Sequence, residues 1–244
     1  MQKIKIRFYE ELNDFLPKSK QKQIFEIEYF GRQSVKDLIE SQGVPHTEID
    51  LILINGISVG FGYIIQPSDF ISVYPQFELI DISPVTKLRQ KPLRNTKFVL
   101  DVQLGKLGKY LRMLGFDTQY QNDYSDNEII DISIDEERII LTRDIGILKH
   151  SKVQRGYWMR NTDPLKQIEE VIMKYDLKNS LNPFSRCMTC NGILKPAEKE
   201  KIIERLEPNT KKYFDEFYIC QSCNQIYWKG SHWAKMKEKI QVIR

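Results

Sequence analysis

The chain has 244 residues, 41% of them hydrophobic, which is enough for one large domain or two small ones with buried cores. No apolar run approaches the roughly 18 residues that a membrane helix needs, and the N-terminus lacks the apolar segment of a signal peptide. We therefore expect a soluble cytoplasmic protein with no membrane partner.

The net charge of +4 is unevenly distributed along the chain. Residues 1–82 carry eight Lys or Arg and twelve Asp or Glu, whereas residues 83–244 carry 29 and 21. A basic C-terminal part is compatible with a nucleic-acid partner, although an ordinary solvated surface explains the charge equally well.

The first 82 residues show an α+β pattern in which alternating strands flank one helix. The expected elements are strands over 3–8 and 23–29, a helix over 34–40 capped by Ser34, a short strand over 51–54, a tight turn at Asn55-Gly56 and a strand over 70–77.

This order, together with the segments 54–57 and 67–75, resembles the β-grasp fold of small ubiquitin-like sulfur carriers. Those carriers end in a free diglycine, whereas this chain continues from residue 76 without one. The resemblance therefore implies a docking or regulatory module with a protein partner, or a purely structural appendage, rather than sulfur transfer.

Three further regions follow this module. Residues 83–96 contain two prolines and several basic residues, which is typical of a linker. Residues 97–177 alternate short strands and helices, which predicts a parallel α/β sheet. Residues 178–244 contain all four cysteines.

Two aspartates, Asp101 and Asp144, fall at or just after the ends of short apolar runs over 97–100 and 138–142. Such runs are typical of buried parallel strands, whose carboxyl ends form the ligand-binding edge of the sheet. Paired carboxylates at that edge suit Mg²⁺ or Mn²⁺ and phosphate-ester hydrolysis. A plain turn or cap role for Asp144 is the alternative.

Asp126 and, more weakly, Asp123 follow the next expected strand, over 117–120, and could add carboxylates at the same edge. Asp126 or Ser125 could instead cap the following helix. Asp163 precedes Pro164 and is expected to cap the helix over 165–175.

Several cations lie close to these acids in sequence. Lys106, Lys109 and Arg112 share one face of the helix that follows Asp101, and Arg143 precedes Asp144. They could contact substrate phosphates. A solvated helix face, or an ion pair of Arg143 with a neighbouring acid, explains them as well.

The four cysteines form two CxxC pairs, Cys187 with Cys190 and Cys220 with Cys223, separated by 29 residues. This spacing predicts a structural Zn²⁺ bound by four thiolates, with a redox dithiol as the alternative. After the second pair, aromatic residues alternate with basic ones, including three lysines over 235–239, and could bind single-stranded nucleic acid by stacking and charge. Tyr227 and Trp228 could instead fill the small core beside zinc.

No Ser-His-Asp or Cys-His arrangement competes with the carboxylates. The chain has three histidines, and none lies in a recognisable catalytic motif. His150 could approach substrate but more simply lies on the surface, and His232 would be superfluous as a zinc ligand.

The segments 98–118, 140–144, 183–187 and 228–233 together resemble the Mut-seven C-terminal RNase family. This resemblance implies a PIN-like nuclease fold with an appended zinc ribbon, and metal-dependent ribonuclease activity. It supports Asp101 and Asp144 most strongly, and then Asp126 and Asp123. The alternative from another class is a non-catalytic adaptor that binds RNA or protein.

Overall fold

The computed structural model describes residues 2–77, 82, 84–88 and 96–230. The chain separates into two compact units, one of residues 1–95 with 130–158 and one of residues 96–129 with 159–244. We describe each unit by itself. The sequence-based boundaries at 82, 96 and 177 stay a prediction.

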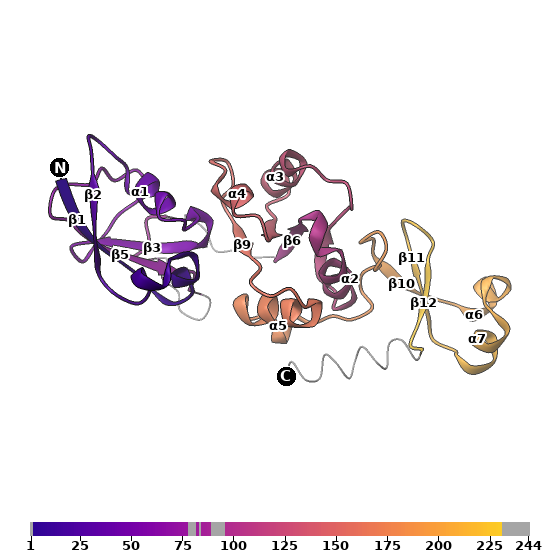
Figure 1. The fold of residues 1–244 in the computed structure, drawn as a ribbon. Coiled ribbons are helices and arrows are strands. Elements are labelled where there is room, and N and C mark those ends of the chain that lie inside the picture. The colour runs from indigo at the N-terminus through magenta and orange to yellow at the C-terminus, as the bar shows by residue number, and fades with distance from the viewer. Residues whose placement is uncertain (1, 78–81, 83, 89–95, 231–244) are drawn as a thin grey trace. The chain divides into compact units, whose positions relative to one another are not determined.

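The first unit contains a mixed five-stranded sheet with the order β2-β1-β5-β3-β4 (Figure 1). Strands β1 and β5 are parallel and the other neighbours are antiparallel. The strands are β1 (Gln2–Phe8), β2 (Phe25–Tyr29), β3 (Ile49–Ile54), β4 (Ile57–Ser58) and β5 (Phe70–Pro75).

The expected turn and cap of this sheet are confirmed. Asn55 and Gly56 both have positive φ and join β3 to β4, as a two-residue hairpin requires. Ser34 caps α1 (Val35–Ser41) by accepting from the Asp37 amide. Three 3₁₀ helices that the sequence did not indicate join these elements: η1 (Glu10–Phe15), η2 (Lys18–Lys20) and η3 (His46–Glu48).

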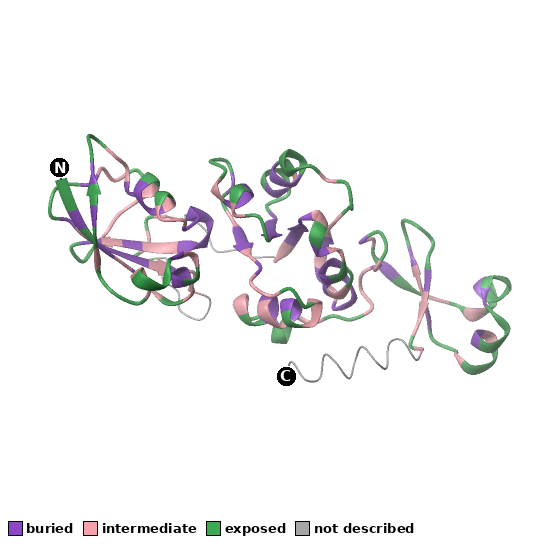
Figure 2. Cartoon of the chain, in the orientation of Figure 1, coloured by how far each residue is buried: buried purple, intermediate pink, exposed green. Residues whose placement is uncertain are grey.

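One hydrophobic core fills this sheet and the inner side of α1. Alternate residues of β1 are buried in it, as the period of two in a strand requires, and Figure 2 colours the buried residues along the strands purple. The largest of its fully buried side chains come from β1, η1, α1, β3 and β5: Ile4, Ile6, Phe8, Leu12, Leu38, Ile39, Ile49, Ile52 and Ile71.

The same unit includes the segment that carries Asp144. Strand β8 (Ile139–Thr142) pairs in parallel with β9 (Gly156–Trp158), and α4 (Ile145–Lys149) connects them. Helix α3 (Asp126–Asp135) precedes β8, and its residues from Ile130 onward belong to this unit.

The second unit begins with β6 (Lys97–Leu100), which pairs in parallel with β7 (Asp117–Gln119). Between them lie η4 (Val102–Leu104) and α2 (Gly105–Met113). In the strand order β7-β6-β8-β9, β6 pairs in parallel with β7 in this unit and β8 pairs in parallel with β9 in the first, so the expected parallel α/β pattern is confirmed. Asp163 caps α5 (Pro164–Lys174) as expected, accepting from two amides of its first turn.

The C-terminal part of this unit contains a small antiparallel sheet, with the order β10-β11-β12, and several short helices. Its elements are η5 (Lys178–Ser180), β10 (Leu194–Ala197), α6 (Lys199–Ile202), η6 (Ile203–Arg205), α7 (Pro208–Tyr213), β11 (Phe217–Cys220) and β12 (Ile226–Trp228). In the part of the chain that the structure describes, no helix has both the length and the apolar character needed to cross a bilayer.

Gly115 ends α2 in a Schellman motif. Its φ is +98°, its amide donates to Arg112, and the Phe116 amide donates to Leu111. A Cβ at this position would overlap the carbonyl oxygen of Asn182. Both the backbone conformation and the packing therefore require glycine.

We predict that Gly115→Ala lowers the free energy of unfolding by about 2 kcal/mol or more, because a left-handed L-residue alone costs about 1–2 kcal/mol. Gly62→Ala is the matched control, since a Cβ there meets nothing within 4 Å. Urea unfolding of both variants checks this, and equal stability of the two would contradict it.

Candidate functional site

Asp101 directly follows the last residue of β6, and its side chain is buried, with 5% of the residue exposed. It occupies the position before η4 but makes no side-chain capping bond to that helix. A buried carboxylate is stable only where hydrogen bonds or a cation compensate for its lost hydration. It lies at the carboxyl end of a strand, which is the edge of a parallel sheet where ligands commonly bind.

The turn after Asp101 is held by Tyr120. The Tyr120 hydroxyl donates to the Val102 carbonyl oxygen at 3.0 Å, and the ring covers Gly105. A Cβ on Gly105 would lie 2.5 Å from that hydroxyl oxygen. The glycine therefore lets the ring approach the first turn of α2 and fix the backbone beside Asp101.

Asp144 follows β8 and caps α4. Its Oδ1 accepts from the Gly146 amide at 2.6 Å, and its own amide donates to Thr142 Oγ1 at 2.8 Å. Asp144 is exposed, whereas Thr142 is buried. The cap role that the sequence left open is thus present. Because a cap uses one carboxylate oxygen, it is compatible with a ligand at the other.

Asp126 is the first residue of α3 and is not its cap. Ser125 and Glu128 form a reciprocal capping box, in which the Ser125 amide donates to Glu128 Oε2 at 2.8 Å. Hydrogen bonds from the backbone and hydroxyl of Ser125 lower the pKa of Glu128. Asp126 and Asp123 are both exposed. Of the two residues proposed as caps from the sequence, Ser125 fills the role.

Three of the four expected phosphate-binding cations are accessible. Lys106 and Lys109 lie on α2 and Arg143 lies between β8 and Asp144, and all three are exposed. Arg143 also accepts, through its carbonyl oxygen, a hydrogen bond of 3.2 Å from the Trp158 indole. His150 is exposed, as expected for a surface histidine.

The prediction that Arg112 shares an exposed helix face with Lys106 and Lys109 is wrong. Arg112 is 3% exposed, and its guanidinium donates to four carbonyl oxygens, those of Thr118, Tyr120, Met188 and Thr189. Burial lowers the pKa of this guanidinium. Arg112 therefore joins α2, β7 and the first cysteine loop, and we do not assign it a phosphate contact.

Asp117 and Asn191 add further contacts between β7 and the first cysteine loop, and neither residue was predicted from the sequence. Asp117 pairs with Arg186 at 3.0 Å and accepts from Asn191 Nδ2 at 2.8 Å. Asn191 Oδ1 accepts from the Thr118 amide at 3.0 Å. The position of Asn191 one residue after the CxxC pair was the available signal, but its partner lies more than 70 residues away.

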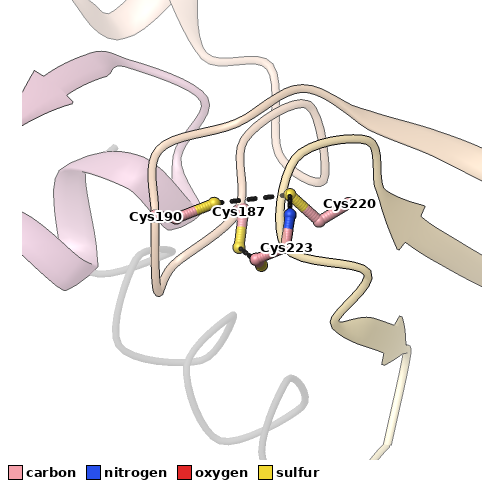
Figure 3. A group of neighbouring side chains, drawn as sticks. All are labelled: Cys187, Cys190, Cys220 and Cys223. Carbon is pink, nitrogen blue, oxygen red and sulfur yellow. Dashed lines mark hydrogen bonds between the residues drawn. The ribbon is translucent and has the colours of Figure 1, made fainter.

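The four cysteine side chains converge from two loops (Figure 3). Their Sγ atoms all lie within 4.8 Å of one another, with 3.6 Å between Cys187 and Cys223 and 3.4 Å between Cys190 and Cys220. A tetrahedral Zn–S distance of about 2.3 Å implies sulfur separations of about 3.8 Å. The residues therefore fit a closed metal site, compatible with structural zinc, and none is in a disulfide.

The thiols in this cluster differ in acidity. Burial raises the pKa of Cys190 to about 12. Burial also opposes ionisation of Cys220, yet the amides of Cys223 and Ser222 donate to its Sγ and lower its pKa to about 7. Amides pointing at sulfur stabilise thiolates, which are the form that binds metal.

The aromatic residues after the second cysteine pair pack inside this module. Trp228 packs against the cluster of Ile202, Leu206, Phe217 and Ile226, and the Tyr227 hydroxyl lies 3.0 Å from Cys187 Sγ. These contacts favour the core role over base stacking. His232, Trp233 and the lysines over 235–239 lie outside the described residues.

We predict that Cys220→Ser reduces the zinc content from one ion per chain to well below one, because the site loses a thiolate. Met188→Leu, between the two cysteines of the first pair, should retain zinc. Metal analysis by mass spectrometry checks this, and full zinc content in Cys220→Ser would contradict a four-thiolate site.

We also predict that Arg112→Lys lowers the free energy of unfolding by about 3 kcal/mol, because a lysine leaves several of the four carbonyl oxygens unpaired. Lys109→Arg is the control, since Lys109 is exposed on the same helix. Chemical unfolding followed by circular dichroism measures the difference, and an unchanged midpoint for Arg112→Lys would contradict the structural role.

Comparison with known protein families covers nearly the whole chain. A family model described as Mut7-C ubiquitin matches residues 1–81, and one described as Mut7-C RNAse domain matches residues 96–240. No curated protein and no solved structure matches the chain. Because the second model spans more than half of the sequence, this chain belongs to the Mut7-C RNAse domain family, with a Mut7-C ubiquitin region at its N-terminus.

Proposed function

We propose that this chain is a metal-dependent ribonuclease on a PIN-like fold with a structural zinc ribbon. Asp101, Asp126 and Asp144 would bind Mg²⁺ or Mn²⁺, with Asp123 adding negative charge nearby. The observation that carries the proposal is the strand order, in which β6 and β8 are neighbours and each is followed by an aspartate at the end of the strand or two residues later. The family match supports RNA as the substrate.

The residues divide the chemistry between them. When bound, Mg²⁺ or Mn²⁺ would supply positive charge for the phosphodiester oxygens and would lower the pKa of a water so that it can lose a proton and act as the nucleophile near neutral pH. Asp144 would offer Oδ2, since Oδ1 accepts from Gly146. Asp101 would offer its carboxylate, and the hydrogen bond from Tyr120 to Val102 holds the backbone turn that follows it. The cap of α3 by Ser125 leaves Asp126 for the same role.

The exposed cations would bind the RNA backbone. Lys106 and Lys109 on α2, and Arg143 beside Asp144, would neutralise phosphates on either side of the scissile bond. The zinc module would hold α2 and β7 in place through Arg112. A protein partner for the ubiquitin-like region stays a prediction.

We predict that Asp144→Asn abolishes Mn²⁺-dependent RNA cleavage without lowering stability. Asparagine still accepts the Gly146 amide as a cap but lacks the charge that binds the cation. Asp163→Asn is the matched control, because Asp163 caps α5 in the same way. Cleavage of labelled RNA with and without Mn²⁺, together with thermal melting, measures both effects.

Asp101→Asn should also abolish cleavage. Equal cleavage by wild type, Asp101→Asn and Asp144→Asn would reject the proposal. Salt-dependent RNA binding with no metal-dependent cleavage in the wild type would instead favour the non-catalytic adaptor.

A further inference from the structure

In the first unit, residues of η3 contact the segment that carries Asp144. The Trp158 amide donates to Glu48 Oε1 at 2.6 Å, and His46 Nε2 lies 2.7 Å from the Val153 carbonyl oxygen. Lys149 Nζ donates to the Glu40 carbonyl oxygen at 2.9 Å. Three hydrogen bonds therefore join the ubiquitin-like region to α4, β9 and the loop between them.

Trp158 continues this connection toward Asp144. It lies opposite Thr142 in the β8–β9 register, and its indole Nε1 donates to the Arg143 carbonyl oxygen at 3.2 Å. The Phe15 ring from η1 packs on the indole with 5.1 Å between centroids. Trp158 is thus held by the ubiquitin-like region on one side and holds the residue before Asp144 on the other.

The loop that carries Asp144 is short. Between β8 and α4, the structure gives the Asp144 amide a bond to Thr142 and the Asp144 carboxylate a bond to Gly146. Helix α4 has only five residues, too few to fix the loop by its own cooperativity. The contacts of Trp158 therefore add a support for this loop from outside the helix.

We infer that the ubiquitin-like region positions Asp144, with Glu48 and Phe15 acting through Trp158 as positioning residues for the proposed metal site. Glu48 is 1% exposed, so removing its carboxylate leaves the Trp158 amide inside a buried contact without this acceptor. The link to cleavage rests on the proposed function. The link to the Asp144 loop rests on these contacts alone.

Two variants test the connection at different points. Trp158→Phe keeps the ring packing and the backbone bond to Glu48 but removes the indole donor to Arg143. Glu48→Ala removes the acceptor for Trp158, and Glu48→Gln restores one. Tyr63→Phe is the control, because it removes a side-chain donor, to Asp69, elsewhere in the same unit.

The first measurement is hydrogen exchange at the Asp144 and Gly146 amides. Trp158→Phe and Glu48→Ala should raise the exchange rate about tenfold, because local opening becomes easier, whereas Glu48→Gln and Tyr63→Phe should not. The second is Mn²⁺-dependent RNA cleavage. In this assay Trp158→Phe and Glu48→Ala should lower kcat by about 10- to 100-fold, because the Asp144 carboxylate is misplaced. Their KM should stay within about twofold, because the residues that bind RNA are unchanged.

Unchanged exchange in both Trp158→Phe and Glu48→Ala would overturn the inference, whatever the activity. Raised exchange with unchanged kcat would also overturn it, because the contact would then be structural only. If the wild type shows no metal-dependent cleavage, the proposed function fails, and the exchange measurement alone decides whether the ubiquitin-like region holds the Asp144 loop.

Discussion

A carboxylate at the end of a buried strand is the constraint on which this account depends. Asp101 is almost fully buried where β6 ends, and an ionised group in that position must recover the interactions it loses with water. Asp144 follows the neighbouring strand in the sheet order, with one oxygen committed to an amide. A hard divalent cation, as we propose, would balance the charge of both carboxylates and would activate a water for phosphodiester hydrolysis.

The rest of the second unit can be understood as support for that strand end. Tyr120 fixes the turn after Asp101, and Arg112 ties the same helix to β7 and to the first cysteine loop. A guanidinium suits this joint because its planar fork donates in several directions at once. Metal binding by the four cysteines would therefore stabilise more than its own small sheet, since the loop it orders also holds α2.

Features that depend on residues close together in the sequence could be predicted. The caps at Ser34 and Asp163 and the Asn55-Gly56 turn follow from the chemistry of single residues, and each is present. The cysteine spacing likewise predicted the cluster. These features depend on neighbours in sequence, so the sequence is sufficient to find them.

Contacts between distant segments were not predictable in the same way. The spacing of Arg112 after Lys106 and Lys109 fits a shared helix face, and only the packed structure shows that its partners are carbonyl oxygens up to 77 residues away. The bond between Glu48 and Trp158 spans 110 residues, and neither residue lies in a motif. A metal site shared by Asp101 and Asp144 would likewise depend on segments distant in sequence, and it stays a proposal.

Anomalous diffraction from crystals soaked in Mn²⁺ tests the central claim most directly. We predict a manganese peak coordinated by carboxylate oxygens of both Asp101 and Asp144, distinct from the metal of the four cysteines. Carboxylates too far apart to share an ion, or a peak that contacts neither residue, would contradict the account and leave a cysteine-stabilised member of the family without the proposed catalytic site.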